Sequence, residues 1–294
     1  MSLTIEPQGA AGSKLPVWDT ICFSYSTYFY NFQDVLRICW LWLAVTALLT
    51  GFANWLNFSW LAGVMADLKL PPQTQTHLTS RPVETVVLGQ VAGLIFILAG
   101  LSIAVAWHRR IILGEHPGFS GRNVIAKNLW RYMGMGLAVC LPLTLPALVV
   151  VLPKFLLFPP VKTGAVSWIA MLIPVSFLLF LAAIAIMLRL ILLLPARAVG
   201  DLGLTFKETW NGTRGNVWRI LWGIAACTML PMLPAQIAFV SFFGFLPSLS
   251  MFASGKFVER MAITNTILAL YFLLILPIGI GFLSYSYSHF FRRT

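Results

Sequence analysis

Six long apolar runs, separated by short connections, are the feature that most constrains how this sequence can fold. Each run is long enough to cross a bilayer, because a hydrocarbon core of about 30 Å requires about 20 helical residues. Only 10% of the residues are charged and 59% are hydrophobic, whereas a soluble domain carries about 25% charged residues. We therefore predict an all-α, polytopic membrane protein with six transmembrane helices. The expected spans are residues 36–56, 86–107, 132–152, 165–194, 220–246 and 261–283.

The segment before the first span divides into two parts. Residues 1–15 are polar and predict a disordered tail without a cleavable signal peptide, so the first span itself directs insertion. Residues 17–36 carry apolar side chains at helical spacing but too many polar ones to span the membrane. We expect an amphipathic helix in the membrane interface there. The rest of the chain, 16–294, is predicted to form a single membrane domain.

The distribution of basic residues predicts the topology. Of the 20 Lys and Arg residues, 14 fall on the side of the membrane that holds the N-terminus, and the remaining 6 fall on the other side. Cytoplasmic connections carry the excess of Lys and Arg in membrane proteins. With six spans, both termini are therefore expected in the cytoplasm, and the interface helices are expected on the same side.

The sequence also suggests an internal repeat. The pattern Asn-x-Trp-Arg occurs at 128–131 and 216–219, and a looser version, Asn-Phe-Gln-Asp-Val-Leu-Arg, occurs at 31–37. Pro146 and Pro234 each lie 15 residues after the arginine of their own copy. A threefold unit of interface helix, outgoing span and returning span would explain these matches. The alternative is a coincidence among residue types that are common at membrane interfaces.

The polar residues within the spans carry little chemistry. No ionisable residue lies at the centre of an expected span, which argues against a proton-coupled transporter or an ion pump. The sequence shows no carboxylate pair, Ser/His/Asp set, phosphate loop or metal-ligand cluster, so no enzymatic activity, metal or cofactor is predicted. The cysteines are interpreted as small apolar side chains. They are Cys22, Cys39, Cys140 and Cys227.

Two pairs of prolines mark candidate breaks in the third and fifth spans. Pro142 and Pro146 lie in the third span, and Pro231 and Pro234 lie in the fifth. Paired discontinuous spans in matching repeats are a sequence indication of a substrate site in transporters. The alternative is that these prolines only kink the helices and ease their packing, which transmembrane helices tolerate.

A layer of arginines is expected at the cytoplasmic ends of the spans. Guanidinium groups bind phosphate well, and basic pockets on the cytoplasmic side bind anionic lipid headgroups. The alternative is ordinary topology signalling with side chains that snorkel to the interface. Arg189 is the most unusual member because only apolar residues follow it closely, and Asp201 or Glu208 is expected to pair with it. The candidate contacts are Arg37, Arg110, Arg131, Arg189, Arg219 and Arg292.

Two connections resemble a known bacterial family. They read RLILLLPARAVGDLGLTFKETWNGTRGNVWRIL and AWHRRIILGE. In the first, an Arg and a Pro close a span, and an amphipathic segment behind a capping box of Thr205 and Glu208 leads to Trp-Arg. Together they resemble the YciC-like group and the membrane domain attached to some glycerophosphodiester phosphodiesterases. The resemblance implies a bacterial inner-membrane protein, and it implies no phosphodiesterase activity, because the separate catalytic barrel is missing.

The expected function is that of a non-catalytic scaffold or accessory subunit, serving a membrane complex or the organisation of lipid. Its expected partners are membrane lipids with anionic headgroups on the cytoplasmic face, together with other membrane proteins, and no nucleic acid. The alternative is a transporter or lipid-handling permease that uses the proline-containing third and fifth spans. A cavity between those two spans would favour the alternative.

Overall fold

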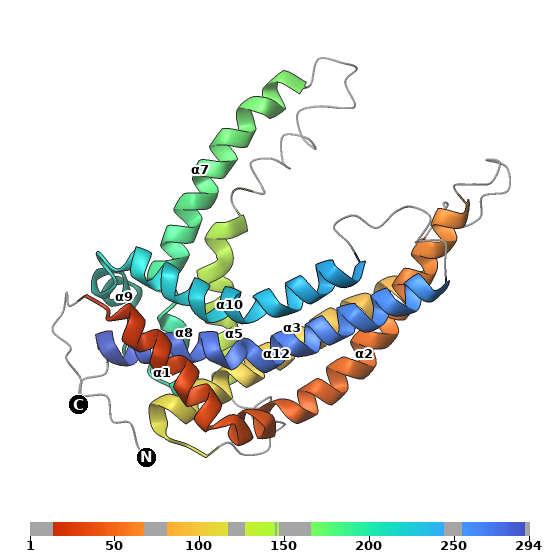
Figure 1. Ribbon diagram of the computed structural model, residues 1–294. Helices are drawn as coiled ribbons and strands as arrows, with labels where there is room; N and C mark the ends of the chain where they lie inside the picture. Colours follow the sequence, from red (N-terminus) through yellow and green to blue (C-terminus); the bar gives the residue numbers. More distant parts are fainter. Residues whose placement is uncertain are drawn as a thin grey trace.

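The computed structural model describes residues 14–67, 81–116, 127–144, 146, 166–243 and 255–291, and within these ranges the chain is helical (Figure 1). Five helices among the described residues are long and apolar enough to cross a membrane, so the chain is a multi-pass membrane protein. The helices are α1 (Val17–Tyr30), α2 (Phe32–Asp67), α3 (Val83–Leu113), α5 (Lys127–Cys140), α7 (Val166–Leu190), α8 (Leu193–Val199), α9 (Phe206–Gly212), α10 (Val217–Phe243) and α12 (Gly255–Phe291), with a 3₁₀ turn, η2, at Leu141–Leu143.

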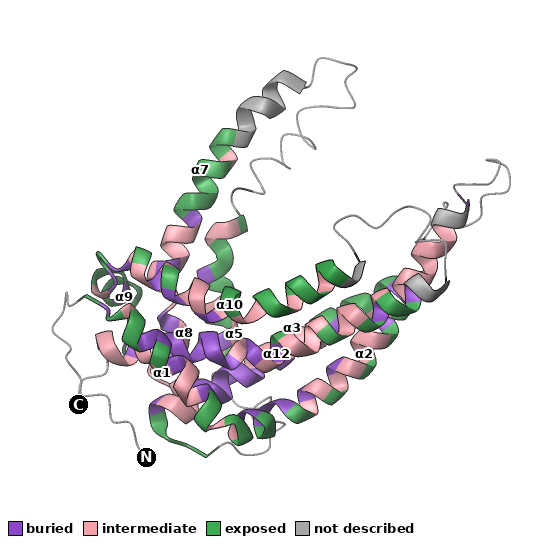
Figure 2. Cartoon of the chain, in the orientation of Figure 1, coloured by how far each residue is buried: buried purple, intermediate pink, exposed green. Residues whose placement is uncertain are grey.

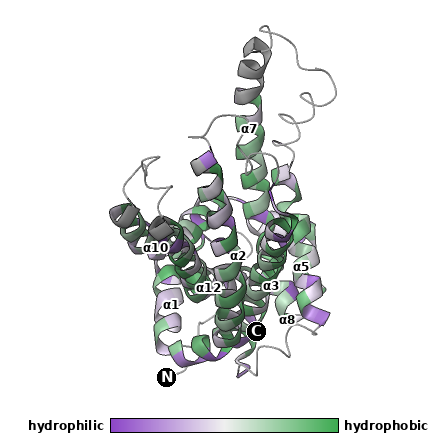
Figure 3. Cartoon of the chain, turned by 90° about the vertical axis from the view of Figure 1, so that its right-hand side faces the viewer, coloured by the Kyte–Doolittle hydropathy of each residue, from purple (hydrophilic) through white to green (hydrophobic). Residues whose placement is uncertain are grey.

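Helix α12 lies at the centre of the bundle and packs against α1, α2, α3 and α10. The buried residues concentrate in its second half and in the last part of α3, as Figure 2 shows. Phe282 and Trp107 are among the largest fully buried side chains. By contrast, α7 and the far part of α10 expose most of their surface, and that surface is predominantly hydrophobic (Figure 3). Exposed apolar helices of this kind are suited to contact with lipid.

The long helices begin and end beyond the predicted apolar cores. The first span, expected at 36–56, is the middle of α2, which has 36 residues and would be about 54 Å long at 1.5 Å per residue. The amphipathic segment, expected to run to residue 36, ends at Tyr30. The carbonyl of Asn31 then accepts the amide of Val35 and starts α2. Hydropathy locates only the part of a helix that lies inside the hydrocarbon core, which explains why α2 is longer than the predicted span.

The other expected boundaries have three different outcomes. The fourth span, expected at 165–194, passes through Pro174 without a break and ends at Leu190, directly after Arg189. The third span, expected at 132–152, is described only to residue 144 and at 146, so its far half lies outside the described residues. Of the predicted tail, residues 1–13 also lie outside them, whereas Leu15 is fully buried.

Helix α1 places hydroxyl groups against the bundle and leaves several of its aromatic rings exposed. Ser24 donates to the carbonyl of Ile278, and Tyr28 donates to the carbonyl of Leu274 at 3.2 Å. Trp18 and Tyr30 are exposed by 74% and 86%. Hydroxyls that bond across helices are common where the surroundings are lipid, because an unpaired polar group is costly there. The predicted interface helix is therefore bonded to the core of the protein along its length.

Two glycines allow the helices around α12 to approach closely. A Cβ atom at Gly281 would lie 2.6 Å from the Ser24 hydroxyl oxygen, so α1 can reach α12 only because that side chain is missing. A Cβ atom at Gly223 on α10 would lie 1.9 Å from the ring of the buried Phe282. Small residues at such crossings are typical of helix packing in membranes.

Candidate functional site

The predicted arginines gather at one end of the bundle, where α2, α5 and α10 begin and α3 and α7 end. We call this the arginine end. The short helices α8 and α9 lie here, and α8 packs against α3, α5 and α12. Each arginine of this end has a distinct set of contacts, and these contacts separate the arginines that support the fold from those that retain an uncompensated charge.

Arg110 and Arg37 share one carboxylate. The Nε atom of Arg110, at the end of α3, donates to Asp34 at 2.9 Å, and its Nη2 atom donates to the side-chain oxygen of Asn31 at 3.2 Å. Arg37 lies 3.6 Å from the other oxygen of Asp34. The Arg110–Asp34 pair is 22% and 13% exposed, so it joins α3 to the start of α2 in a partly desolvated place. This charge is largely neutralised by the protein itself.

The neighbouring Arg109 is also compensated. It forms two hydrogen bonds with Glu115, at 2.8 and 2.5 Å, in the fork geometry that suits a guanidinium and a carboxylate. A further donor of Arg109 reaches the carbonyl of Ala198 at 3.4 Å and so connects the end of α3 with α8. Arg109 therefore acts as a link between two structural elements.

Arg189 does not have the carboxylate partner that we predicted. Its guanidinium carbon lies 4.2 Å from the ring centre of Trp210, which is a cation–π contact. Asp201 instead accepts the hydroxyl of Tyr287 at 2.8 Å, and Glu208 closes the capping box of α9 with Thr205. The predicted capping box is confirmed, but it uses the Glu208 carboxylate, which we had expected to reach Arg189. The prediction of an Arg189 ion pair is therefore wrong.

Arg219 contacts the segment that precedes α1. Its Nη1 atom donates to the carbonyl of Leu15 at 2.7 Å, and the Leu15 amide donates to the Asn216 side-chain oxygen at 3.0 Å. The Leu15 carbonyl and the Asn216 side chain are both neutral, so neither of them offsets the positive charge of Arg219. Arg131, at the corresponding place in the Asn-x-Trp-Arg pattern, is half-buried in the first turn of α5. Arg292 lies outside the described residues.

A buried polar cluster lies just inside the arginine end and was missed by the sequence analysis. His108, fully buried near the end of α3, has its Nδ1 atom 2.7 Å from the hydroxyl of Ser284 on α12. Its Nε2 atom lies 3.4 Å from the hydroxyl of Tyr132 on α5. The cluster joins three helices. Its sequence signal was the position of His108 at the end of an apolar run, directly before two arginines.

Two tyrosines of α1 keep their protons at ordinary pH. Tyr25 donates to the carbonyl of Ala226 on α10 at 3.0 Å, and Tyr28 donates to α12. Burial, with smaller contributions from nearby Cys and Tyr groups, raises the pKa of Tyr25 and that of Tyr28 to about 12. Both phenols therefore remain neutral donors, which suits structural hydrogen bonds and not proton transfer.

The four candidate prolines occupy different settings. The α-helical part of α5 ends at Cys140 and a 3₁₀ turn follows at Pro142, while the carbonyl of Pro146 accepts the hydroxyl of Ser176 on α7 at 3.1 Å. Helix α10 continues through Pro231 and Pro234, so the predicted break in the fifth span is wrong. Tyr271 of α12 donates to the carbonyl of Pro231 at 2.6 Å and so ties this part of α10 to α12.

Among the residues that the structure describes, no group of three or more His, Cys, Asp or Glu side chains is placed to hold a metal ion. Comparisons with protein-family models, curated proteins and solved structures found no match to this chain. The resemblance to the YciC-like group therefore remains a prediction, and the argument for function rests on the geometry of the arginine end.

Proposed function

We propose that this protein is a non-catalytic scaffold or accessory subunit of the bacterial inner membrane, and that its arginine end holds anionic phospholipid headgroups in the cytoplasmic leaflet. The supporting observation is that every ion pair found among the described residues uses Asp34 or Glu115. Arg131, Arg189 and Arg219 therefore keep their charge without a carboxylate partner in the described part of the chain. Phosphate oxygens are suited to such guanidinium groups.

The aromatic residues around these arginines support a position at the membrane surface. Trp130 and Trp218, which directly precede Arg131 and Arg219, are 54% and 72% exposed. Trp210, beneath Arg189, is 39% exposed. Tryptophan prefers the level of the lipid headgroups. A phosphate bound by these arginines would therefore lie at the depth where lipid phosphates are found, with both chain termini on the cytoplasmic side.

The threefold repeat forms part of the proposal, as the framework that places the arginines. Asn31 and Asn216 each precede a long helix, and the carbonyl of each accepts the amide four residues later, from Val35 and Ile220. A short helix, α1 or α9, precedes each of these junctions. In the second copy, the residues from 117 to 126 that would hold the corresponding short helix lie outside the described residues.

The scaffold role is supported by the surface of α7. Val175, Phe177, Leu178 and Leu181 point in different directions around the helix and are exposed by 48%, 59%, 65% and 47%. The described part of the chain thus leaves α7 uncovered on several sides. We expect lipid and the helices of other membrane proteins to cover it. Purification in mild detergent followed by mass spectrometry should recover partner proteins, and a lone monomer without bound lipid would contradict the proposal.

The lipid role is tested with a triple variant, Arg131→Gln, Arg189→Gln and Arg219→Gln. The variant should retain less than a third of the phosphatidylglycerol that co-purifies with the original protein, as measured by mass spectrometry. Arg37→Gln is the matched control, because Arg37 is exposed and already lies beside Asp34, and it should retain the original amount. A triple variant that elutes as a folded monomer with unchanged phosphatidylglycerol would refute the lipid role.

A transporter or lipid-handling permease is the alternative, and one cavity favours it. A cavity of about 490 Å³ lies between α10 and α12, with Pro234, Phe239, Ile267 and Tyr271 in its lining. The cavity expected for a transporter was between the third and fifth spans, and this one instead faces the sixth. Uptake of a labelled lipid into proteoliposomes, abolished by Ala238→Trp, would support the alternative over the scaffold role.

A further inference from the structure

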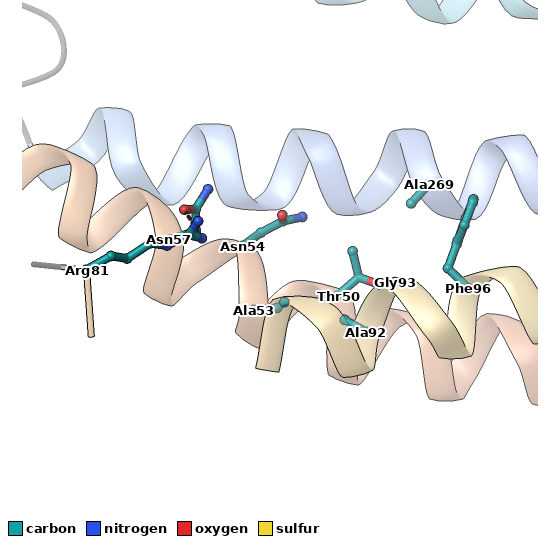
Figure 4. Close-up of a pocket in the computed structure, with 10 residues that line it drawn as sticks. Thr50, Ala53, Asn54, Asn57, Arg81, Ala92, Gly93, Phe96 and Ala269 are labelled. Carbon is teal, nitrogen blue, oxygen red and sulfur yellow. Dashed lines mark hydrogen bonds between the residues drawn. The ribbon is translucent and has the colours of Figure 1, made fainter. Parts of the chain in front are cut away.

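A second cavity lies far from the arginine end, where α3 begins. It has a volume of about 320 Å³, and α2, α3 and α12 line it (Figure 4). One end of the lining is polar, with Asn57 and Arg81, and the other end is apolar, with Ala92, Gly93 and Phe96. A ligand that matches this order has a polar head and an apolar chain.

The polar end carries a positive charge that the described residues do not neutralise. Arg81 donates through Nη2 to the side-chain oxygen of Asn57 at 2.6 Å, and its guanidinium carbon lies 5.6 Å from the ring centre of Trp60. No ion pair of Arg81 occurs among the described residues. A guanidinium has five N–H donors, and these contacts use only a small part of that capacity. The geometry fixes the head of Arg81 beside Asn57 and leaves donors for an anion.

The middle of the cavity offers a further polar group. Asn54 donates to the hydroxyl of Thr266 on α12 at 3.3 Å, which ties α2 to α12 behind the cavity. The hydroxyl oxygen of Thr50 is buried and has no hydrogen-bond partner within the described chain. Because that oxygen has almost no accessible surface, the polar group that a ligand would meet in the middle of the cavity is the side chain of Asn54.

The apolar end is open because glycines line it. A Cβ atom added to Gly89 or to Gly93 would meet no atom within 4 Å, so this face of α3 is not packed against the rest of the described chain. The absence of side chains here creates a slot beside Phe96 and Ala92 that a hydrocarbon chain can enter from the surrounding bilayer.

The position along the helices matches the layers of a bilayer. Trp55 and Trp60 lie near Asn57 on α2, and tryptophans are enriched at the level of the headgroups. Arg81 precedes the first turn of α3 at the same end. Gly93 lies 10 residues after Val83, the first residue of α3, which places it about 15 Å along the helix at 1.5 Å per residue, in the hydrocarbon core. The cavity therefore runs from headgroup level into the region of the lipid tails.

We propose that this cavity binds one anionic phospholipid from the leaflet opposite the arginine end. Its phosphate contacts Arg81 and Asn57, its ester region lies near Asn54, and one acyl chain lies along Gly89 and Gly93. The charge of Arg81 favours an anionic lipid. Because the cavity is polar at one end and apolar at the other, it suits an amphiphile better than a further transmembrane helix. The proposal does not depend on the arginine end, because it uses other residues in the other leaflet.

The test uses proteoliposomes that contain phosphatidylglycerol with a photoactivatable diazirine in one acyl chain. Mass spectrometry should locate the cross-links on α2 and α3, near Gly93. Gly93→Leu fills the slot without a clash and should lower the yield at this place at least fivefold. Gly134→Leu is the matched control, since a Cβ atom at Gly134 on α5 also meets no atom within 4 Å, and it should leave the yield unchanged.

Headgroup selection is tested in the same vesicles. Arg81→Gln should lower the yield at least fivefold, Arg81→Lys should retain more of it, and Arg214→Gln, an exposed arginine at the other end, should have no effect. An equally strong label at this place from a phosphatidylcholine probe, or an undiminished yield in Gly93→Leu, would overturn the proposal. In both glycine variants the added Cβ atom meets no atom within 4 Å, and elution of each variant as a folded monomer is the check that folding is retained.

Discussion

At both the α1–α2 junction and the α9–α10 junction, an asparagine carbonyl starts a long helix and an arginine follows within a few residues. At the first junction, Asp34 stands between Arg37 and Arg110 and neutralises much of their charge. At the second junction, the hydrogen bond that Arg219 makes within the described part of the chain goes to the neutral carbonyl of Leu15. The backbone arrangement is shared, whereas the charge balance is not.

This difference shows why position alone does not assign a role to an arginine at a membrane surface. All the candidate arginines satisfied the same sequence criterion, namely location at the cytoplasmic end of an expected span. The distinguishing feature is whether a carboxylate of another helix reaches the guanidinium. A residue such as Arg110 then belongs to the fold, and a residue such as Arg219 keeps its capacity to bind an anion.

The largest expected effect comes from the packing behind the second junction. In Gly223→Ala, the new Cβ atom would overlap the ring of the buried Phe282, which is at 1.9 Å. We expect a loss of about 3 kcal/mol in stability, at the upper end of the usual range for overpacking. Gly281→Ala, at the first junction, should cost less because the Ser24 hydroxyl can rotate. Thermal unfolding in detergent checks this order, and equal values for both variants would contradict it.

The second prediction converts the first junction into a copy of the second. Asp34→Asn leaves the partly buried Arg110 without its carboxylate, and we expect a loss of about 1–2 kcal/mol. The same change should increase the phosphatidylglycerol that co-purifies with the protein, because two guanidinium groups lose their neutralising partner. A variant with less stability and no additional lipid would show that charge balance does not control lipid retention.

A smaller effect is expected when Asn216 loses its side-chain acceptor. In Asn216→Ala, the Leu15 amide has no bond to the side-chain oxygen, which contributes about 1 kcal/mol. Hydrogen exchange at the Leu15 amide should become about fivefold faster. Asn128→Ala serves as the control, since Asn128 holds the same place in the sequence pattern and does not bond to Leu15. Equal acceleration in both variants would argue against the specific bond.

The last prediction concerns pH and Tyr25, whose hydroxyl bonds to α10. Burial raises the pKa of Tyr25 from about 10 to about 12. Between these values the unfolded chain has lost the phenolic proton and the folded chain retains it, so stability should fall as pH rises from about 10 to about 12. Tyr25→Phe should show a shallower fall in chemical unfolding measured across this range. An identical slope would exclude this tyrosine as a contributor.

The sequence predicted the membrane class, the approximate centres of five of the six expected spans and the capping box of α9. These depend on local composition and spacing, which a single sequence contains. It could not predict that α2 continues to Asp67. Outside the membrane, a polar segment has the same hydropathy whether it continues the helix or forms a loop.

The contacts of individual polar residues were harder to predict. We predicted that Arg189 pairs with a carboxylate close in sequence. Those carboxylates instead accept the hydroxyl of Tyr287 and cap the start of α9, and Arg189 contacts an aromatic ring. His108 bonds to Ser284, a residue 176 positions later. The cavity at Arg81 depends on glycines beside which no other side chain packs, and this is known only once the three helices are assembled. Such contacts depend on tertiary packing, for which a single sequence holds no direct signal.

The bonds between α1 and α12 have a consequence for the synthesis of the protein. Ser24 and Tyr28 bond to carbonyls that lie 254 and 246 positions later in the chain. Until α12 leaves the ribosome and enters the membrane, these hydroxyls and His108 have no acceptor on that helix. A nascent chain that stalls before Gly255 therefore presents unsatisfied polar groups to lipid, where membrane-bound proteases can distinguish it from a chain that has received α12.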